Sequence, residues 1–384
     1  MNIGINASFM RKPGTGIGQV TTHFLHELIR RSHTDRSFKN HKFFIYSEEL
    51  IDMDFPKNFT CRHFLPHYYR RDDLFRRLLW EKFSLPCCAH RDKCDVLISL
   101  YQSATVIKYT DMRHIMVVHD VIPHIFAEYL DNMRKKIYWK YVEKGMYGSH
   151  KIIAVSEYTK IDLATRLNIK EQKITVAPIA VDPIFSNIVS QEEMDRVMDV
   201  YKLESKKYIY TGGGLELRKC ADRTLRAYKM LRERIPDAPT LVISGKLMPE
   251  LAPLIVDVEQ IVYDLGLVDH VRIIGFVPQA DLPALYKGAV CFVFPSLYEG
   301  FGMPVLEAMN IGTPVITSRD SSLSEVGGDA VVYAEHDDEA LCEKMREVIL
   351  DHTLQEMISA KEKEQAQKFS WQSFVEKIWE TVTM

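Results

Sequence analysis

Two glutamates, Glu299 and Glu307, flank a glycine-rich stretch that reads E-G-F-G-M-P-V-L-E. Carboxylates accept hydrogen bonds from hydroxyl groups, and sugars are rich in hydroxyls. Between the two carboxylates, Gly300 and Gly302 allow the backbone to turn sharply and to approach a ligand closely. Backbone amides exposed by such a turn bind anions such as a diphosphate. These residue types at this spacing predict a pocket for a sugar attached to a diphosphate.

The elements that must position this stretch are a strand before it and a helix after it. The apolar run from Val290 to Phe294 is typical of a buried parallel strand. Pro304 suits the first turn of a helix, and Gly312 suits its end. The N-terminus of this helix would direct the amides near Met303 toward an anion. An ordinary turn with surface glutamates remains the alternative on these residues alone, because glycine turns are common.

The two glutamates around G-F-G-x-P, followed by E-A-M, resemble the signature of the retaining glycosyltransferases of family 4, also called glycosyl transferases group 1. The resemblance implies that Glu299 contacts hydroxyls of the donor sugar and that Glu307 binds the ribose diol. It also implies that the backbone of four residues cradles the sugar and the distal phosphate, namely Gly300, Phe301, Gly302 and Met303.

A second glycine-rich loop, T-G-G-G-L-E-L-R-K-C, follows the strand pattern from Tyr208 to Tyr210. Its Arg218 and Lys219 could place positive charge over a diphosphate, although exposed Arg-Lys pairs are usually only solvated. The E-x-R-K sequence resembles that of family 4, which implies donor binding by both residues and a catalytic part for Lys219. Cys220 stands where the family commonly has Asn or Gly, so the share of phosphate binding carried by Arg218 stays open.

A polar pair, His119-Asp120, ends the apolar strand pattern from His114 to Val118 within V-V-H-D-V-I-P. Open α/β sheets bind ligands at the carboxyl ends of their strands. A structural role at the strand end is the alternative. The segment resembles the family's H-D-x-x-P, which implies that His119 approaches the donor sugar near the reacting carbon. The expected catalytic residues are His119, Glu299 and Lys219.

Two further loops bear family resemblances. Pro13 to Gln19 reads P-G-T-G-I-G-Q, which lacks the G-x-G-x-x-G dinucleotide fingerprint. It resembles the family's G-x-G loop, which implies that Gly16 lies beside the diphosphate and the acceptor. The segment G-F-V-P-Q-A-D-L resembles the loop that holds the nucleobase, which implies donor contacts at Val277 and Leu282.

The whole pattern predicts an α/β protein with two Rossmann-like domains. A chain of 384 residues exceeds one typical core. The resemblance implies the GT-B type, in which the two domains face a cleft. We expect an N-terminal acceptor-side domain at residues 1–182 and a nucleotide-sugar domain at 183–366. The amphipathic tail at 367–384 is expected to pack back on the first domain.

Composition narrows the class of protein. The net charge of −3 gives no general field for polyanions, so nucleic acid is not an expected partner. Seven cysteines without framework spacing are read as reduced thiols rather than disulfides or a zinc site. No run approaches a membrane span of roughly 18 apolar residues. A strand pattern that begins at Ile3 leaves no room for a signal peptide, so we expect a cytoplasmic protein.

Two other stretches carry charge. Asp52-Met53-Asp54 is formally the metal-binding D-x-D of the other major glycosyltransferase fold, but it lacks a leading strand and is read as solvated turn charge. Arg70 to Phe83 has apolar residues at helical spacing together with four arginines and three aromatics. It is read as a helix packed on the sheet with its arginines extended to solvent, and contact with an anionic membrane is the alternative.

The resemblance covers nearly the whole chain and implies a metal-independent retaining transfer of a sugar to an acceptor hydroxyl. The H-D-x-x-P, E-x-R-K and G-F-V-P-x-x-D-L segments look most like mannosyltransferases of bacterial surface polysaccharides. We therefore favour GDP-mannose as donor and a glycan or lipid-linked acceptor, with possible peripheral contact at the inner membrane face. The alternatives are a nucleotide-sugar epimerase on the same fold and a catalytically inactive nucleotide-sugar-binding protein.

Overall fold

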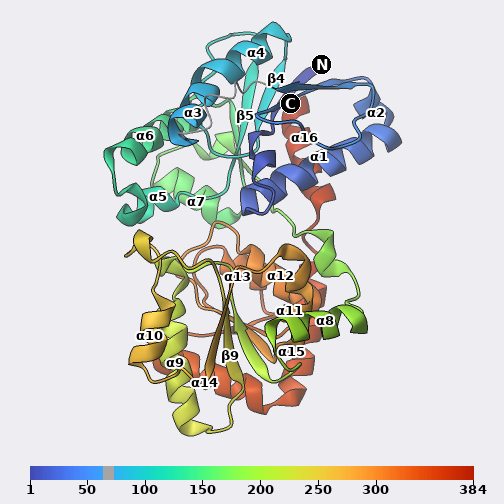
Figure 1. The fold of residues 1–384 in the computed structure, drawn as a ribbon. Helices are drawn as coiled ribbons and strands as arrows, with labels where there is room; N and C mark the ends of the chain where they lie inside the picture. Colours follow the sequence, from blue (N-terminus) through green and yellow to red (C-terminus); the bar gives the residue numbers. More distant parts are fainter. Residues whose placement is uncertain (64–72) are drawn as a thin grey trace. The chain divides into compact units, whose positions relative to one another are not determined.

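The computed structural model describes residues 1–63 and 73–384 (Figure 1). The chain divides into two compact units. Unit 1 comprises Met1–Ala180 together with Phe369–Met384, and unit 2 comprises Val181–Lys368. Each unit is built on one parallel sheet whose central strands are almost entirely buried, as expected for sheets covered by helices on both faces.

Unit 1 contains, among its described residues, a seven-stranded parallel sheet in the order β3-β2-β1-β4-β5-β6-β7. The strands are β1 (Asn2–Asn6), β2 (Lys42–Ser47), β3 (Phe59–His63), β4 (Val96–Ser99), β5 (Arg113–Val118), β6 (Lys151–Ala154) and β7 (Ile174–Val176). The helices are α1 (Gly16–Thr34), α2 (Arg36–Lys39), α3 (Asp73–Leu79), α4 (Leu85–Arg91), α5 (Ile122–Ile125), α6 (Met133–Gly148), α7 (Glu157–Thr165) and α16 (Trp371–Thr383). Shorter turns are η1 (Ser8–Arg11), η3 (Trp80–Ser84), η4 (Ala127–Leu130) and η5 (Glu171–Lys173).

Unit 2 contains a six-stranded parallel sheet in the order β10-β9-β8-β11-β12-β13. The strands are β8 (Tyr208–Thr211), β9 (Thr240–Ser244), β10 (Val271–Gly275), β11 (Cys291–Phe294), β12 (Val315–Thr317) and β13 (Val332–Tyr333). The helices are α8 (Gln191–Tyr201), α9 (Ala221–Arg234), α10 (Val258–Asp264), α11 (Leu282–Gly288), α12 (Met303–Ile311), α13 (Leu323–Gly327), α14 (Asp338–Leu350) and α15 (His352–Ala366). Shorter turns are η6 (Pro183–Ser186), η7 (Leu217–Lys219), η8 (Pro249–Leu251) and η9 (Gln279–Asp281).

In both sheets the strand order reverses beside the first strand of the unit. The reversal lies between β1 and β4 in unit 1 and between β8 and β11 in unit 2. At such a switch point the loops after the two central strands run to opposite sides of the sheet, and ligands bind in the space left between them. The topology therefore predicts a ligand site in each unit at the carboxyl ends of its two central strands.

The two Rossmann-like units expected from the sequence are confirmed, and the expected strands are present. One strand, β3, was missed, because F-T-C-R-H at the sheet edge has little apolar pattern. Gly312 ends α12 with a positive φ, as predicted. Ser156 caps α7 by accepting a hydrogen bond from the amide of Thr159.

The C-terminal helix packs on the first unit, as expected. α16 belongs to unit 1 and lies beside α1, where red and blue meet in Figure 1. Trp379 stacks on Phe38 with ring centroids 4.0 Å apart, and Arg31 forms an ion pair with Glu376. Aromatic burial and a charge contact thus fix the chain end to its own N-terminal unit.

The basic stretch before Phe83 is not a single α-helix. Arg70 and Arg71 lie outside the described residues. α3 ends at Leu79 and continues as the π-helical turn η3. Arg76 is buried and lies 2.9 Å from Glu48, while the Arg77 guanidinium lies 4.9 Å from the centre of the Phe9 ring. These two arginines therefore make contacts inside unit 1 and do not extend to solvent.

Candidate active site

The glycine loops that follow β8 and β11 meet at the switch point of unit 2. β8 and β11 are adjacent in the sheet, with Ile209 opposite Cys291 and Tyr210 opposite Phe292. Both loops leave the carboxyl ends of their strands, so the residues predicted from two separate motifs come together at one edge. This edge is the candidate donor site.

Two glycines are required where the loops approach their neighbours. Gly213 has a φ of +89°, and a Cβ at this position would lie 2.8 Å from Cγ of Pro304. Gly302 has a φ of +103°, and its Cβ would lie 2.7 Å from Cδ2 of Leu323. A side chain at either position would meet both backbone strain and a steric clash. The first glycine thereby lets the β8 loop contact the first turn of α12.

The N-terminus of α12 points amides at this edge. Gly302 is the N-cap of α12, and its carbonyl accepts the amides of Val305 and Leu306. The amides of Gly302 and Met303 have no acceptor among the residues that the structure describes. Such amides, together with the helix dipole, favour an anion at this position.

Arg218 and Glu299 form a buried ion pair beside the helix. Nη1 of Arg218 lies 2.5 Å from Oε1 of Glu299 and donates a second bond of 2.7 Å to the carbonyl of Tyr298. Oγ of Ser296 lies 3.1 Å from the same carboxylate oxygen. Oε2 of Glu299 has no partner among the described residues. The arginine thus orients the glutamate and leaves one carboxylate oxygen able to accept from a hydroxyl.

Lys219 is held at the glycine loop. Its Nζ donates to the carbonyl of Gly213 and lies 3.5 Å from Oε2 of Glu216. Burial raises the pKa of Glu216, but the charges of Lys219 and Arg218 outweigh it and leave that pKa below its ordinary value. An ammonium has three N–H donors, so these two contacts leave one for a phosphate oxygen.

Glu307 lies one turn into α12 and is buried. Its Oε2 accepts a hydrogen bond of 3.0 Å from the hydroxyl of Tyr286 on α11, and Oε1 has no partner in the described part of the chain. Burial raises its pKa to about 7, against the opposing effects of the Tyr286 hydrogen bond and the charge of Lys219. Asp182 raises it further. Burial therefore makes this carboxyl group harder to ionise than that of an exposed glutamate.

Val277 and Leu282 lie in the loop after β10, at the start of α11. Val277 is buried and Leu282 is the first residue of α11. Asp281 fixes this loop, because its carboxylate accepts from Arg196 at 2.7 Å and from Tyr201 at 3.0 Å. α11 also carries Tyr286, so the same helix orients Glu307 and the loop predicted to hold the base.

His119 and Gly16 belong to unit 1. Nε2 of His119 lies 2.9 Å from the carbonyl of Leu100, which can only accept, so Nε2 carries the proton. Burial lowers the pKa of His119 to about 4, so the ring is neutral at pH 7 and Nδ1 is an acceptor. Gly16 is the exposed first residue of α1, whereas a Cβ at Gly18 would lie 1.9 Å from the carbonyl oxygen of Lys12. The packing constraint in that loop thus falls on Gly18.

A buried carboxylate, Glu81, braces the switch point of unit 1. It accepts from the hydroxyls of Tyr101 at 2.9 Å and Tyr138 at 3.0 Å, and from the amide of Ala104 at 2.8 Å. Burial raises its pKa to about 7, while the nearby charge of Arg77 opposes the shift. This network ties η3 and α6 to the end of β4.

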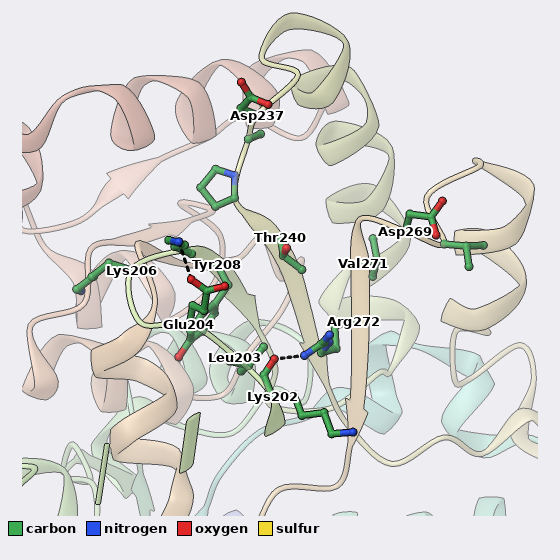
Figure 2. A pocket seen from close by; sticks show the side chains of 14 residues that line it. Lys202, Leu203, Glu204, Lys206, Tyr208, Asp237, Thr240, Asp269, Val271 and Arg272 are labelled. Atoms are coloured by element: carbon green, nitrogen blue, oxygen red, sulfur yellow. Dashed lines mark hydrogen bonds and ion pairs between the residues drawn. The ribbon is translucent and has the colours of Figure 1, made fainter. Parts of the chain in front are cut away.

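A separate cavity of about 760 Å³ lies at the opposite end of the unit 2 sheet, where β8, β9 and β10 begin (Figure 2). Some of its charged side chains have partners in the protein. Lys207 pairs with Glu204 at 2.5 Å, and Arg272 donates to the carbonyl of Lys202. None of the predicted site residues lines this cavity.

Three site residues were missed by sequence reasoning. Tyr286 lies in an apolar helical pattern that indicates only a core position. Ser296 directly follows the Pro that ends β11, and a lone serine there gives no functional signal. Glu216 did have a signal, because it is the first residue of the E-x-R-K sequence that was used only for its two cations.

Three further findings bear on the alternatives. Asp52 and Asp54 lie in the loop between β2 and β3 and are exposed. All seven cysteines are free thiols, as expected. No helix among the described residues is long and apolar enough to cross a membrane.

Comparison with known proteins supports the same assignment for both units. The family model described as Glycosyltransferase Family 4 matches residues 14–185, and the one described as Glycosyl transferases group 1 matches residues 194–365. O-antigen chain mannosyltransferase B of Escherichia coli is 30% identical over 262 residues, covering 68% of this chain and 68% of that protein. Serotype-specific mannosyltransferase WbdA of Escherichia coli is 30% identical over 260 residues, which span 67% of this chain but only 32% of WbdA.

Among solved structures, WaaG, described as a glycosyltransferase involved in lipopolysaccharide biosynthesis, aligns with a TM-score of 0.73 over 100% of both chains at 15% identity. At this identity the likeness shows the fold alone, which is the GT-B type expected from the sequence.

Proposed function

Because the chain belongs to the glycosyltransferases of family 4, the glycosyl transferases group 1, we propose that it transfers a hexose from a nucleoside diphosphate sugar to a hydroxyl of a glycan or lipid-linked acceptor. The donor we favour is GDP-mannose, and the anomeric configuration is retained. The product would belong to a bacterial surface polysaccharide.

The observation that carries this proposal is the arrangement of unit 2. Lys219 and the α12 amides are donors for a diphosphate, and the free carboxylate oxygens of Glu299 and Glu307 are acceptors for hydroxyls. Donors for phosphate bracketed by two acceptors for hydroxyls match the polarity of a nucleotide sugar. Sugar hydroxyls would meet Glu299, and the ribose diol would meet Glu307.

The reaction breaks the bond between the anomeric carbon and the diphosphate oxygen and forms one between that carbon and the acceptor oxygen. Negative charge grows on the leaving diphosphate. Lys219 and the amides of Gly302 and Met303 would stabilise that charge without a metal ion, and each such contact is worth about 10²–10³ in rate. In the retaining reaction the acceptor attacks the face that the diphosphate leaves, so the leaving phosphate can accept the acceptor's proton.

The preference for mannose rests on relatives, since O-antigen chain mannosyltransferase B and WbdA are both named mannosyltransferases. The same names support a role in surface polysaccharide synthesis. Hydrogen bonds from backbone groups near Val277 would recognise the base. Because backbone groups leave no side-chain signal for one base, the choice of GDP rests on the resemblance of motifs.

The test is a panel of GDP and UDP sugars, with binding read by calorimetry and turnover read by release of the nucleoside diphosphate. We expect GDP-mannose to bind most tightly and, without acceptor, to be hydrolysed faster than the other donors, although slowly. NMR of the transfer product should show an axial anomeric bond. Preference for a UDP sugar would replace the donor but keep the reaction class. Binding without hydrolysis or transfer would instead indicate an inactive binding protein, and interconversion of two nucleotide sugars would indicate an epimerase.

A further inference from the structure

One face of α6 in unit 1 exposes apolar and basic side chains in a single stripe. Met133, Ile137, Lys140, Lys144 and Tyr147 are all exposed and follow one another at intervals of four and three residues. This spacing places them along one side of the helix. The exposed fractions of Met133, Ile137 and Tyr147 are 66%, 47% and 51%. We call these five residues the α6 stripe.

The helix that carries the stripe is strongly basic. Its sequence, M-R-K-K-I-Y-W-K-Y-V-E-K-G-M-Y-G, contains five Lys or Arg residues and one Glu. The single glutamate, Glu143, lies 3.3 Å from His124, so its carboxylate is directed to that histidine and not to a lysine of the stripe. Because the whole chain has a net charge of −3, this positive charge is a local concentration.

The neighbouring turn η3 adds another exposed aromatic residue. Nζ of Lys82 lies 3.9 Å from the centre of the Tyr141 ring on α6 and 5.5 Å from that of Phe83. Nζ of Lys144 lies 5.5 Å from the same Tyr141 ring. Phe83 is 58% exposed, so it extends the stripe with a large apolar group. Figure 1 shows α3, which leads into η3, beside α6.

The opposite side of α6 is what holds the helix in place. Trp139, Val142 and Met146 are buried in the core with β5 and β6, and Tyr138 bonds to Glu81. The α6 stripe is therefore not needed for the packing of unit 1. Exposed apolar residues among lysines on a well-anchored helix call for a partner outside the chain.

We propose that the α6 stripe and Phe83 dock unit 1 on the surface of an anionic lipid bilayer. Apolar side chains on such a helix enter the boundary between headgroups and acyl chains, and lysines on either side meet lipid phosphates. A second copy of this chain fits less well, because a symmetric contact would bring lysines against lysines. The inference rests on the proposed function in one respect, since a lipid-linked acceptor is presented at a bilayer.

This surface differs from the one that the sequence suggested. There, the arginines between Arg70 and Phe83 were the candidate for membrane contact. Of these, Arg76 and Arg77 are used inside unit 1. The fold instead exposes Lys140 and Lys144 on α6.

The experiment is co-sedimentation of the full chain with vesicles of phosphatidylcholine alone or mixed with phosphatidylglycerol, without donor or acceptor. We expect binding only to the mixed vesicles, weakened by salt. Each lysine near an anionic surface contributes roughly fivefold, so Lys140→Gln with Lys144→Gln should lower the partition coefficient about 25-fold. Phe83→Ser with Ile137→Ser should lower it roughly tenfold, because two apolar groups no longer insert.

Control variants lie on unit 2, where Lys361→Gln on α15 and Tyr263→Ser on α10 alter residues that are also exposed. Both should bind vesicles like the unmodified chain, and all variants should keep its melting temperature. Absence of binding to mixed vesicles, or equal binding by the α6 variants, overturns the proposal. Loss of a dimer in the Phe83 and Ile137 variant without vesicles overturns it in favour of self-association. Because no sugar is present, these outcomes are independent of whether the chain transfers mannose.

Discussion

Arg218 and Glu299 form a buried ion pair, with Nη1 of the arginine 2.5 Å from Oε1 of the glutamate and both side chains nearly inaccessible to solvent. The two residues come from different glycine loops, 81 positions apart in the chain. Each was predicted to contact the donor directly. The pairing gives the arginine a positioning role, because it orients the carboxylate that we propose meets the sugar.

The first prediction concerns this pair. Arg218→Met leaves the Glu299 carboxylate buried without its partner, which typically costs about 3–5 kcal/mol of unfolding free energy. Adding Glu299→Gln to this variant should recover most of that loss, because no uncompensated charge remains. Urea unfolding of both single variants and the double variant measures the coupling. Simply additive effects would show that the pair contributes no interaction energy. Turnover should stay low in the double variant, since the carboxylate is gone.

The second prediction separates the two glutamates. Glu307→Ala should weaken binding of both the bare nucleoside diphosphate and the donor, roughly 10- to 100-fold for a lost charge-assisted hydrogen bond. Glu299→Ala should spare the bare nucleotide, because its proposed partner is the sugar. Calorimetry with nucleotide and nucleotide sugar tests both, and Glu299→Gln serves as the conservative control. The opposite pattern would reverse the two assignments.

The third prediction follows from the raised pKa of Glu307, about 7. Only the ionised carboxylate can accept from both ribose hydroxyls, so nucleotide binding should tighten about tenfold as pH rises from roughly 6 to 8. Phosphate ionisation over the same range is common to all variants. Glu307→Gln is therefore the reference, and it should lack the part of the pH dependence that comes from the carboxyl group. Equal slopes for the two proteins would contradict ribose binding by Glu307.

The stability of the unliganded protein should depend on pH in the opposite direction to nucleotide binding. A carboxyl group whose folded pKa is raised stabilises the fold fully below its ordinary pKa of 4.5 and loses that contribution as pH rises through about 7. Glu307→Gln should therefore melt higher than the unmodified protein at pH 8 and no higher at pH 4.5. Melting curves at the two pH values provide the check.

The fourth prediction concerns His119, which lies in unit 1, whereas the residues proposed to bind the nucleotide lie almost all in unit 2. His119→Ala should lower turnover about 10²-fold or more with nucleotide affinity nearly unchanged. The acceptor Nδ1 suits a hydrogen bond from a sugar hydroxyl. If His119 only packs the strand end, the variant should melt lower but turn over normally per folded molecule. Both quantities are to be measured on one preparation.

The fifth prediction concerns metal ions. If Lys219 and the α12 amides carry the phosphate charge, activity should survive EDTA. Lys219→Met should then lower turnover by about 10²–10³, with or without added Mn²⁺. Full loss of activity in EDTA, restored by Mn²⁺, would contradict this assignment and indicate Asp52 and Asp54 as candidate metal ligands.

The sequence alone determined the two-unit α/β plan and most of its strands, because buried parallel strands are short apolar runs between turns. It also determined the glycine loop at Gly302 and the helix end at Gly312, since these depend on local backbone geometry. The family resemblance rests on the same short-range patterns. Local chemistry was sufficient wherever a residue's neighbours in space are its neighbours in the chain.

Only the tertiary structure decided how side chains from distant segments pair. It turned Arg218 toward Glu299 and Arg76 toward Glu48, and it left Lys140 and Lys144 exposed on α6. It also set the pKa of Glu307, through burial and through Tyr286 from the preceding helix. Desolvation and pairing depend on which elements become neighbours after folding. Charged residues of the same type can therefore lie in a binding site, in the core or on a docking surface. Their positions in the sequence do not determine which of these environments they occupy.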